Sequence, residues 1–139
     1  PRGLGHAVYR ARNHIGDSTF AVMLGDDLID ERDPLLPKML AENERTGLTV
    51  IALMEVDPEH VHLYGVASVE PTDDPDVVRV TGLVEKPAKE DAPSNYAVIG
   101  RYVLVPGVFD ILERIEPGKG GAMTRRAWQV SRAQRELPQ

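Results

Sequence analysis

Two adjacent carboxylates, Asp26 and Asp27, follow the apolar run Phe20–Leu24 and Gly25. In open α/β sheets, ligands bind beyond the carboxyl ends of the strands, so a buried strand here would carry both side chains to such a site. Mg²⁺ takes one or two protein carboxylates and completes its shell with phosphate and water oxygens. An aspartate of this pair could therefore be a Mg²⁺ ligand, but paired aspartates are common in loops, and an Asx turn or a helix cap leading into residues 30–34 explains the pattern without a metal.

A second pair of charged residues, Glu85 and Lys86, ends an apolar segment and is followed directly by Pro87. A carboxylate accepts hydrogen bonds from hydroxyl groups, and a lysine ammonium pairs with phosphate. These residue types suit a sugar hydroxyl and a phosphate respectively. A solvated ion pair at a turn would give the same sequence.

Gly3 and Gly5 stand at the start of a helical stretch, Gly5–His14. Glycines there allow a ligand to approach the backbone and the N–H groups of the first helical turn. The pattern is not a complete G-x-G-x-x-G, so a plain turn into the helix explains it equally well.

The elements that must position these residues alternate between strands and helices. Apolar segments without period-2 alternation are typical of strands buried on both faces, and such strands alternating with helices predict an α/β layered fold with a largely parallel sheet. The expected strands are Phe20–Leu24, Leu48–Val56 and Ala97–Val105, and the expected helices are Gly5–His14, Pro34–Thr46 and Val108–Ile115.

The helix over residues 34–46 carries its own boundary signals. Asp33 is the predicted N-cap, Pro34 the first helical residue and Gly47 the stop. In the middle of the chain, Val66–Val69 and Val77–Val84 predict a small antiparallel pair around an acidic turn. No repeat or low-complexity linker interrupts the chain, which favours one domain.

Composition excludes several classes of protein. The chain has 139 residues, 42% of them hydrophobic and none of them cysteine, so a globular domain without disulfides, thiolate metal sites or a cysteine nucleophile is expected. The net charge of −6 argues against a nucleic-acid binder. No apolar run is long enough to cross a bilayer, and no basic-then-apolar leader opens the sequence. We therefore expect a cytoplasmic protein with no membrane or nucleic-acid partner.

Charge is distributed unevenly along the chain. Residues 1–118 carry 11 basic and 21 acidic side chains, whereas residues 119–139 carry 5 basic and 1 acidic. So sharp a change indicates a C-terminal segment of different character.

Taken in order and at these intervals, the motifs resemble the bacterial UTP–glucose-1-phosphate uridylyltransferases (UDP-glucose pyrophosphorylases). The resemblance covers about Gly3–Gly121, nearly the whole chain. The motifs that carry it are Gly3–Val8, Phe20–Asp27, Tyr64–Val66, Gly82–Pro87, Ala92–Asn95 and Ile99–Leu104.

The resemblance implies a Rossmann-like nucleotide-diphospho-sugar transferase fold, with an incomplete, mostly parallel sheet flanked by helices and a small antiparallel insertion. It also implies the activity: UTP and glucose 1-phosphate are joined with Mg²⁺ to give UDP-glucose and pyrophosphate. A sugar phosphate oxygen would attack the nucleotide α-phosphorus in line, so catalysis would rest on positioning and charge neutralisation.

Residue roles follow from the same resemblance. Asp26 would hold Mg²⁺ against the phosphates, supported by Asp27, and Gly65 would make room for the sugar. Glu85 would accept hydrogen bonds from glucose hydroxyls, and Lys86 would pair with the sugar phosphate. Gly3 and Gly5 would lie near the uridine.

Two departures from the family pattern accompany the resemblance. Family members begin with a strand and a Gly-x-Gly-Thr-Arg loop with a downstream lysine, and nothing like that precedes Pro1. After Gly121, a family segment ending in an aspartate that supplies a second contact to Mg²⁺ is replaced by Ala122–Trp128. The expected organisation is therefore a partial nucleotidyltransferase domain over residues 1–121, lacking its nucleotide loop. A divergent basic tail over 122–139, from a shifted reading frame or a foreign source, would follow it.

Three alternatives stay open at this point. The chain is catalytically active, or inactive as a non-catalytic module that binds UDP-sugar or pairs with a full-length homologue, or belongs to another group of sugar-1-phosphate nucleotidyltransferases. The family resemblance also suggests a homo-oligomer.

Overall fold

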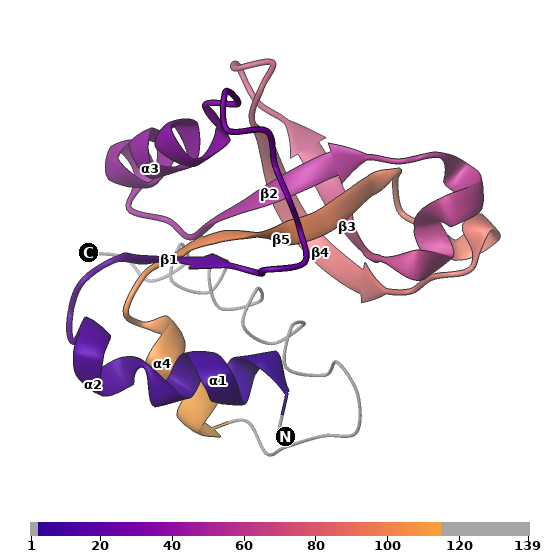
Figure 1. Cartoon of the computed structure of the whole chain (residues 1–139). Coiled ribbons are helices and arrows are strands. Elements are labelled where there is room, and N and C mark those ends of the chain that lie inside the picture. Colours follow the sequence, from indigo (N-terminus) through magenta and orange to yellow (C-terminus); the bar gives the residue numbers. More distant parts are fainter. Residues whose placement is uncertain (1–2, 115–139) are drawn as a thin grey trace. The chain divides into compact units, whose positions relative to one another are not determined.

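The computed structural model describes residues 3–114, and these residues form two compact units (Figure 1). Unit 1 comprises residues 3–52 and 99–114, and unit 2 comprises Leu53–Val98. Two strands, β2 (Val50–Glu55) and β5 (Tyr96–Leu104), contribute residues to both units. The predicted basic tail over 122–139 lies outside the described residues.

The sheet of unit 1 is built around the second half of β5. Strand β1 (Phe20–Met23) pairs with it antiparallel, in a register that runs from Phe20 opposite Leu104 to Met23 opposite Arg101. Helix α3 lies on one side of β1, and α1, α2 and α4 lie on the other (Figure 1). The bounds of these helices are α1 Leu4–Arg10, α2 Arg12–Ile15, α3 Leu35–Thr46 and α4 Val108–Arg114. No helix in the described range is long and apolar enough to cross a membrane.

Apolar contacts hold helices against both faces of this sheet. On the α3 side, Met39 packs with Ala52 and Val103. On the other side, the ring of Phe109 in α4 stacks on Phe20 of β1, with centroids 5.1 Å apart. The prediction of a strand buried on both faces was wrong for β1, because Phe20 and Val22 are half-buried whereas Ala21 and Met23 on the opposite face are exposed.

Helix α3 begins one residue later than its predicted cap implies. Pro34 is the N-cap residue and no side chain caps the helix, so the assignment of Asp33 as N-cap was wrong. The Asp33 N–H instead donates to the Asp30 carbonyl (2.9 Å), which closes a turn before the helix starts. At the other end the prediction is confirmed: Gly47 is left-handed, with φ 69°, and its N–H donates to the Asn43 carbonyl (2.7 Å).

Unit 2 is built on an antiparallel hairpin, as predicted. Strand β3 (Gly65–Pro71) pairs with β4 (Val78–Glu85), with one irregularity between Ser68 and Val69. Strand β3 also pairs antiparallel with the start of β5, where Val66 lies opposite Ala97. Both of these side chains are fully buried.

Two short 3-10 helices complete unit 2: η1 (Pro58–Leu63) and η2 (Lys89–Asp91). Their contact includes an ion pair between Glu59 and Lys89, which raises the pKa of the Lys89 ammonium. Val61 of η1 is almost completely buried and anchors that helix in the unit.

The predicted, largely parallel sheet was wrong for the described strand pairs. The β1–β5, β3–β4 and β3–β5 pairs, whose registers are defined, are all antiparallel. A continuous apolar run indicates that both faces of a strand are covered, but it carries no information on the direction of the neighbouring strands. The described fold is therefore a mixed α/β arrangement whose defined pairings are antiparallel.

Candidate functional site

The Asp26–Asp27 turn follows β1 directly. Asp26 is exposed, and its carboxylate makes no hydrogen bond or ion pair with any residue that the structure describes. Asp27 is half-buried, and its N–H donates to the Leu24 carbonyl (3.3 Å). Neither carboxylate forms an Asx turn or a helix cap within the described range. The structural alternative therefore does not account for this pair.

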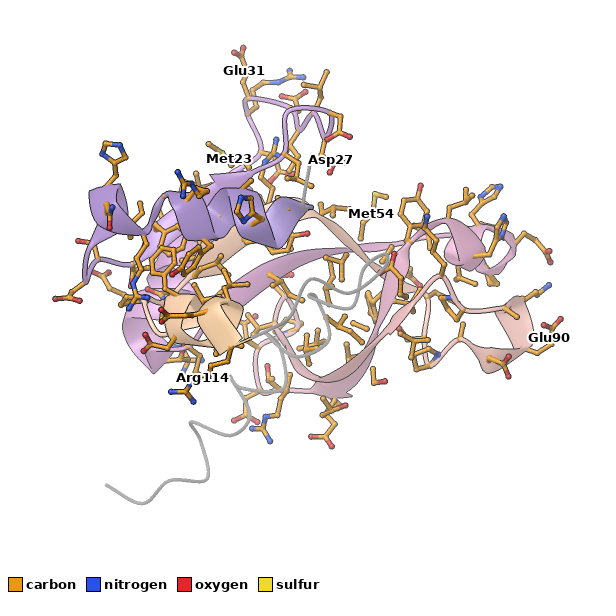
Figure 2. All side chains as sticks on the ribbon, turned by 90° about the horizontal axis from the view of Figure 1, so that it is seen from below. Met23, Asp27, Glu31, Met54, Glu90 and Arg114 are labelled. Carbon is orange, nitrogen blue, oxygen red and sulfur yellow. The ribbon has the colours of Figure 1, made fainter. Side chains whose placement is uncertain are left out.

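An Asx turn does form farther along the same loop, at Asp30. Its Oδ1 accepts the N–H of Arg32 (2.9 Å), and the Arg32 guanidinium donates to both carboxylate oxygens. These hydrogen bonds stabilise the ionised form, so they lower the pKa of Asp30 to about 2. Figure 2 shows Glu31 at the tip of this projecting loop. Asp30 thus has a structural partner, whereas Asp26 has none among the described residues.

Gly100 and Arg101 of β5 contact the turn from 73 or more residues farther along the chain. The Arg101 guanidinium donates through Nη1 to the carbonyls of Leu24 (3.1 Å) and Gly100 (3.0 Å), and through Nη2 to the Asp27 carbonyl. A methyl group on Gly100 would overlap the Asp27 carboxylate and lie 2.7 Å from Leu24 Cβ. Sequence reasoning missed both residues. The available signal was a Gly-Arg pair inside the otherwise apolar segment 97–105.

The donor set of this turn fits a Mg²⁺ ion better than a metal held wholly by protein. No group of three or more His, Asp or Glu side chains within residues 3–114 gathers closely enough to hold a metal ion. The exposed Asp26 carboxylate, which has no partner in the described part of the chain, and Asp27 beside it match the donors that Mg²⁺ takes when phosphates and water supply the rest. His60 and His62, both exposed, form no such cluster either.

Gly65 and Glu85 lie opposite each other where β3 and β4 come together, although 20 residues separate them in sequence. A methyl group on Gly65 would lie 3.2 Å from Glu85 Oε2, so the glycine leaves the space beside that carboxylate open. Glu85 is exposed, and its side chain bonds to none of the described residues. The carboxylate is therefore available to accept hydrogen bonds from a ligand.

Lys86 has a backbone conformation that side-chain-bearing residues rarely adopt. Its φ is +45°, and its N–H donates to the Tyr64 carbonyl (2.9 Å). The next residue, Pro87, is buried and fixes the chain beyond it. Strain of this kind persists only where the surroundings enforce it, and it is common at ligand sites.

The ammonium of Lys86 is exposed and forms no ion pair with the described residues, Glu85 included. The alternative of a surface ion pair between these two neighbours is thus not what the structure shows. Both charged residues are exposed and have no partner within residues 3–114, which leaves an acceptor and a cation for a polar, anionic ligand.

The remaining glycines open helix α1. Gly3 has φ 87°, in the left-handed region, and caps α1 without a side chain. A methyl group on Gly3 would meet no atom within 4 Å. Gly5 lies in the first turn of the same helix. The glycine at position 3 is thus explained by its backbone conformation and not by crowding.

Ser94 and Asn95, part of a motif that sequence analysis singled out, have structural partners in unit 2. The Ser94 hydroxyl donates to the Ala67 carbonyl (2.6 Å) and accepts the Tyr96 N–H (3.0 Å). The Asn95 carbonyl accepts the Val56 N–H (2.9 Å). The bond from Ser94 to Ala67 thus holds the segment before β5 against β3, on which Gly65 lies, and the bond from Val56 joins the same segment to the residue after β2.

The predicted site residues thus fall into two groups. One group, in unit 2, consists of Gly65, Glu85 and Lys86. The other residues belong to unit 1, where the structure brings Asp26 and Asp27 together in one turn and places Gly3 and Gly5 at the start of α1.

The chain is similar to proteins of the nucleotidyl transferase family. The sequence profile of the nucleotidyl transferase family matches residues 1–130. A UTP–glucose-1-phosphate uridylyltransferase from Pseudomonas aeruginosa is 48% identical over 122 residues, which are 86% of this chain and 43% of that protein. The chain therefore spans less than half the length of the curated relatives it matches.

Solved structures agree in fold. The crystal structure of a UDP-glucose pyrophosphorylase complexed with UDP-glucose is 40% identical and superposes with a TM-score of 0.82, over 96% of this chain and 51% of that one. A UTP-bound enzyme of the same type from Acinetobacter baumannii is 29% identical with a TM-score of 0.79, over 98% and 47%. With a family profile that matches nearly its whole length and folds that superpose along it, the chain belongs to the nucleotidyl transferase family.

Proposed function

We propose that this chain forms the sugar- and metal-binding part of a UTP–glucose-1-phosphate uridylyltransferase. The observation that carries the proposal is the placement of Glu85 and Lys86 beside Gly65, with a carboxylate and an ammonium that bond to no described residue. The 48% identity to a protein of that name supports the choice of substrates.

In this proposal the unit 2 residues bind the sugar phosphate. Glu85 accepts hydrogen bonds from glucose hydroxyls, and the absence of a side chain at Gly65 leaves room for the sugar ring beside it. Lys86 pairs with the phosphate, and its enforced backbone conformation fixes the direction in which the side chain leaves the strand end. A charged hydrogen bond of this kind contributes more to affinity than a neutral one.

The unit 1 residues bind the cation and the nucleotide. Asp26 is the Mg²⁺ ligand and Asp27 supports it, and the backbone at Gly3 and Gly5 lies near the uridine. A divalent cation held at Asp26 would neutralise the negative charge of the nucleotide phosphates. Asp26 has no competing partner among the described residues, so its carboxylate needs no rearrangement to serve this role.

The reaction needs no covalent enzyme intermediate. A phosphate oxygen of glucose 1-phosphate forms a bond to the α-phosphorus of UTP, and the bond from that phosphorus to the oxygen that bridges it to the β-phosphorus breaks, which releases pyrophosphate. Catalysis would rest on positioning of the two anions and on neutralisation of their charge.

Calorimetric titration with glucose 1-phosphate and with uridine tests the unit 2 assignment. Lys86→Ala should weaken glucose 1-phosphate binding by about 10-fold or more, because a charged hydrogen bond is lost, and should leave uridine binding unchanged. Lys89→Ala is the matched control, since Lys89 is an exposed lysine of the same unit that pairs with Glu59. Equal weakening of both ligands by Lys86→Ala would contradict the assignment.

Pyrophosphate release separates an enzyme from a binding module. The purified chain would be supplied with UTP, glucose 1-phosphate and Mg²⁺, with Asp26→Asn as control. Pyrophosphate release by the wild type that disappears in Asp26→Asn would show that this chain is sufficient for turnover. Ligand binding without release would support the non-catalytic module, and neither binding nor release from a folded chain would overturn the proposal.

A further inference from the structure

Arg101 contacts the Asp26–Asp27 turn only through main-chain atoms. Its guanidinium donates to the carbonyls of Leu24 and Asp27, which are the first and last residues of the turn, and to the carbonyl of its neighbour Gly100. The Leu24 N–H donates in turn to the Gly100 carbonyl (2.9 Å). The turn is thus tied to β5 at its first and last residues, while Asp26 between them is tied to nothing that the structure describes.

Gly100 adds a steric part to the same arrangement. The space where a side chain on Gly100 would stand is filled by the Asp27 carboxylate and by Leu24. Asp27 therefore lies over the backbone of β5 in a place that only glycine permits. Gly100 thus leaves room for the turn to pack against β5, and Arg101 bonds to the backbone at both ends of the turn.

We propose that Arg101 is a positioning residue for the cation site. It fixes the backbone of residues 24–27 so that the Asp26 carboxylate is presented in one place. The proposal rests on the assignment of Asp26 as the Mg²⁺ ligand. The planar guanidinium suits this role because its fork of donors reaches several carbonyls at once, which an ammonium cannot do.

Electrostatics alone predicts the opposite effect of removing Arg101. A positive charge beside a cation site repels the cation, so its loss would tighten cation binding if charge were all that mattered. If Arg101 positions the turn, its loss should weaken cation binding, because the Asp26 carboxylate is no longer held in one place. The sign of the change therefore distinguishes positioning from charge.

The test is a titration with Mn²⁺ in the presence of saturating UDP-glucose, followed by electron paramagnetic resonance of the free ion. Arg101→Gln should weaken Mn²⁺ binding by about 10-fold, the lower end of what loss of a residue that orients a metal ligand costs. Arg101→Lys should be at least as weak, because it keeps the repulsive charge and loses the fork.

A matched control is Arg12→Gln. Arg12 also makes two hydrogen bonds across unit 1, to Asp110 (3.0 Å) and Glu113 (3.0 Å), so its loss removes comparable bonds away from the turn. It should leave Mn²⁺ affinity unchanged. If Arg12→Gln weakened Mn²⁺ binding as much as Arg101→Gln does, the effect would be one of general stability and the proposal would be overturned.

The remaining outcomes separate this inference from the proposed function. Unchanged or tighter Mn²⁺ binding in Arg101→Gln, with binding lost in Asp26→Asn, would overturn the positioning role of Arg101 and leave the metal site intact. Mn²⁺ binding that is absent in the wild type, or unaltered in Asp26→Asn, would overturn the metal site and the positioning role with it.

Discussion

The two groups of candidate residues are held in place by different means. The Asp26–Asp27 turn is tied to β5 by a guanidinium that lies 77 residues beyond Leu24 in the chain. Glu85 and Lys86 are placed by the pairing of β3 with β4 and by a strained backbone beside Tyr64.

The two groups should therefore respond differently to substitutions. The turn has no regular secondary structure of its own and depends on one residue pair, so a single substitution in β5 can displace it while the sheet survives. The strand-end group shares the stability of the hairpin, and its side chains can be changed with little effect on the backbone. Substitutions that act on one group and spare the other sharpen this contrast.

The largest effect is expected from Asp26→Asn. The substitution removes the charge and keeps the shape of an exposed side chain, so the fold should be unaffected. Loss of a residue that only orients a metal ligand lowers metal affinity by up to roughly 100-fold. Loss of the ligand itself should lower the Mg²⁺-dependent affinity for UDP-glucose by more than that. Calorimetry with and without Mg²⁺ measures this. The same Mg²⁺ dependence in Asp26→Asn as in the wild type would remove the metal assignment.

Gly100→Ala should lower stability by disturbing the packing of the Asp26–Asp27 turn against β5. The new methyl group meets the Asp27 carboxylate and Leu24, so the free energy of unfolding should fall by about 1–3 kcal/mol, as for overpacking elsewhere. Denaturant unfolding measures the change. Gly82→Ala in β4 is the control, because its methyl group would lie 3.5 Å from Ser68 Oγ in ordinary contact. A Gly100→Ala variant as stable as the control would contradict the close approach.

Lys86→Gly should separate stability from binding in unit 2. Glycine adopts φ +45° without strain, so this variant should be about 0.5–1 kcal/mol more stable than Lys86→Ala, after allowing for the freer unfolded chain. Both variants should lose glucose 1-phosphate affinity to the same extent, because both lack the ammonium. Thermal unfolding and calorimetry give the two readings, and equal stability would show that the backbone there is not strained.

The smallest effect concerns Asp30 and Arg32 in the loop after the turn. Arg32→Gln removes the guanidinium hydrogen bonds, the largest cause of the lowered pKa of Asp30, and keeps the bond from the backbone N–H, so that pKa should rise from about 2 part of the way toward its ordinary 3.8. A lowered folded-state pKa contributes stability that is present above pH 3.8 and is lost as pH falls toward 2. The stability difference between wild type and variant should therefore shrink over that interval. NMR titration of the Asp30 carboxyl checks it, and an unchanged pKa in Arg32→Gln would contradict the pairing.

Element positions were largely predictable from the sequence because they depend on local patterns. The apolar runs at 20–24 and 97–105 became β1 and β5, and Gly47 ends α3 in the left-handed conformation that glycine favours. Strand direction was not predictable, because a strand buried on both faces has the same sequence pattern whichever way its neighbours run.

The candidate site was predictable only in part. The charged residues after the apolar segments pointed to Asp26 and Glu85, whose side chains have no partner among residues 3–114. Arg101 was missed because its role depends on a contact across 77 residues, which no local pattern contains. The pairing of Gly65 with Glu85 likewise follows from hairpin register and not from either residue alone.

The assignment of sugar binding to unit 2 and metal binding to the Asp26–Asp27 turn is tested most directly by an NMR titration of the isotopically labelled chain with UDP-glucose, in the presence and absence of Mg²⁺. The backbone signals of Gly65, Glu85 and Lys86 should shift on addition of UDP-glucose. The signals of Asp26 and Asp27 should shift further only when Mg²⁺ is present. Shifts confined to other parts of the chain, or Mg²⁺-independent changes at Asp26, would contradict the assignment of sugar and metal binding to these two groups.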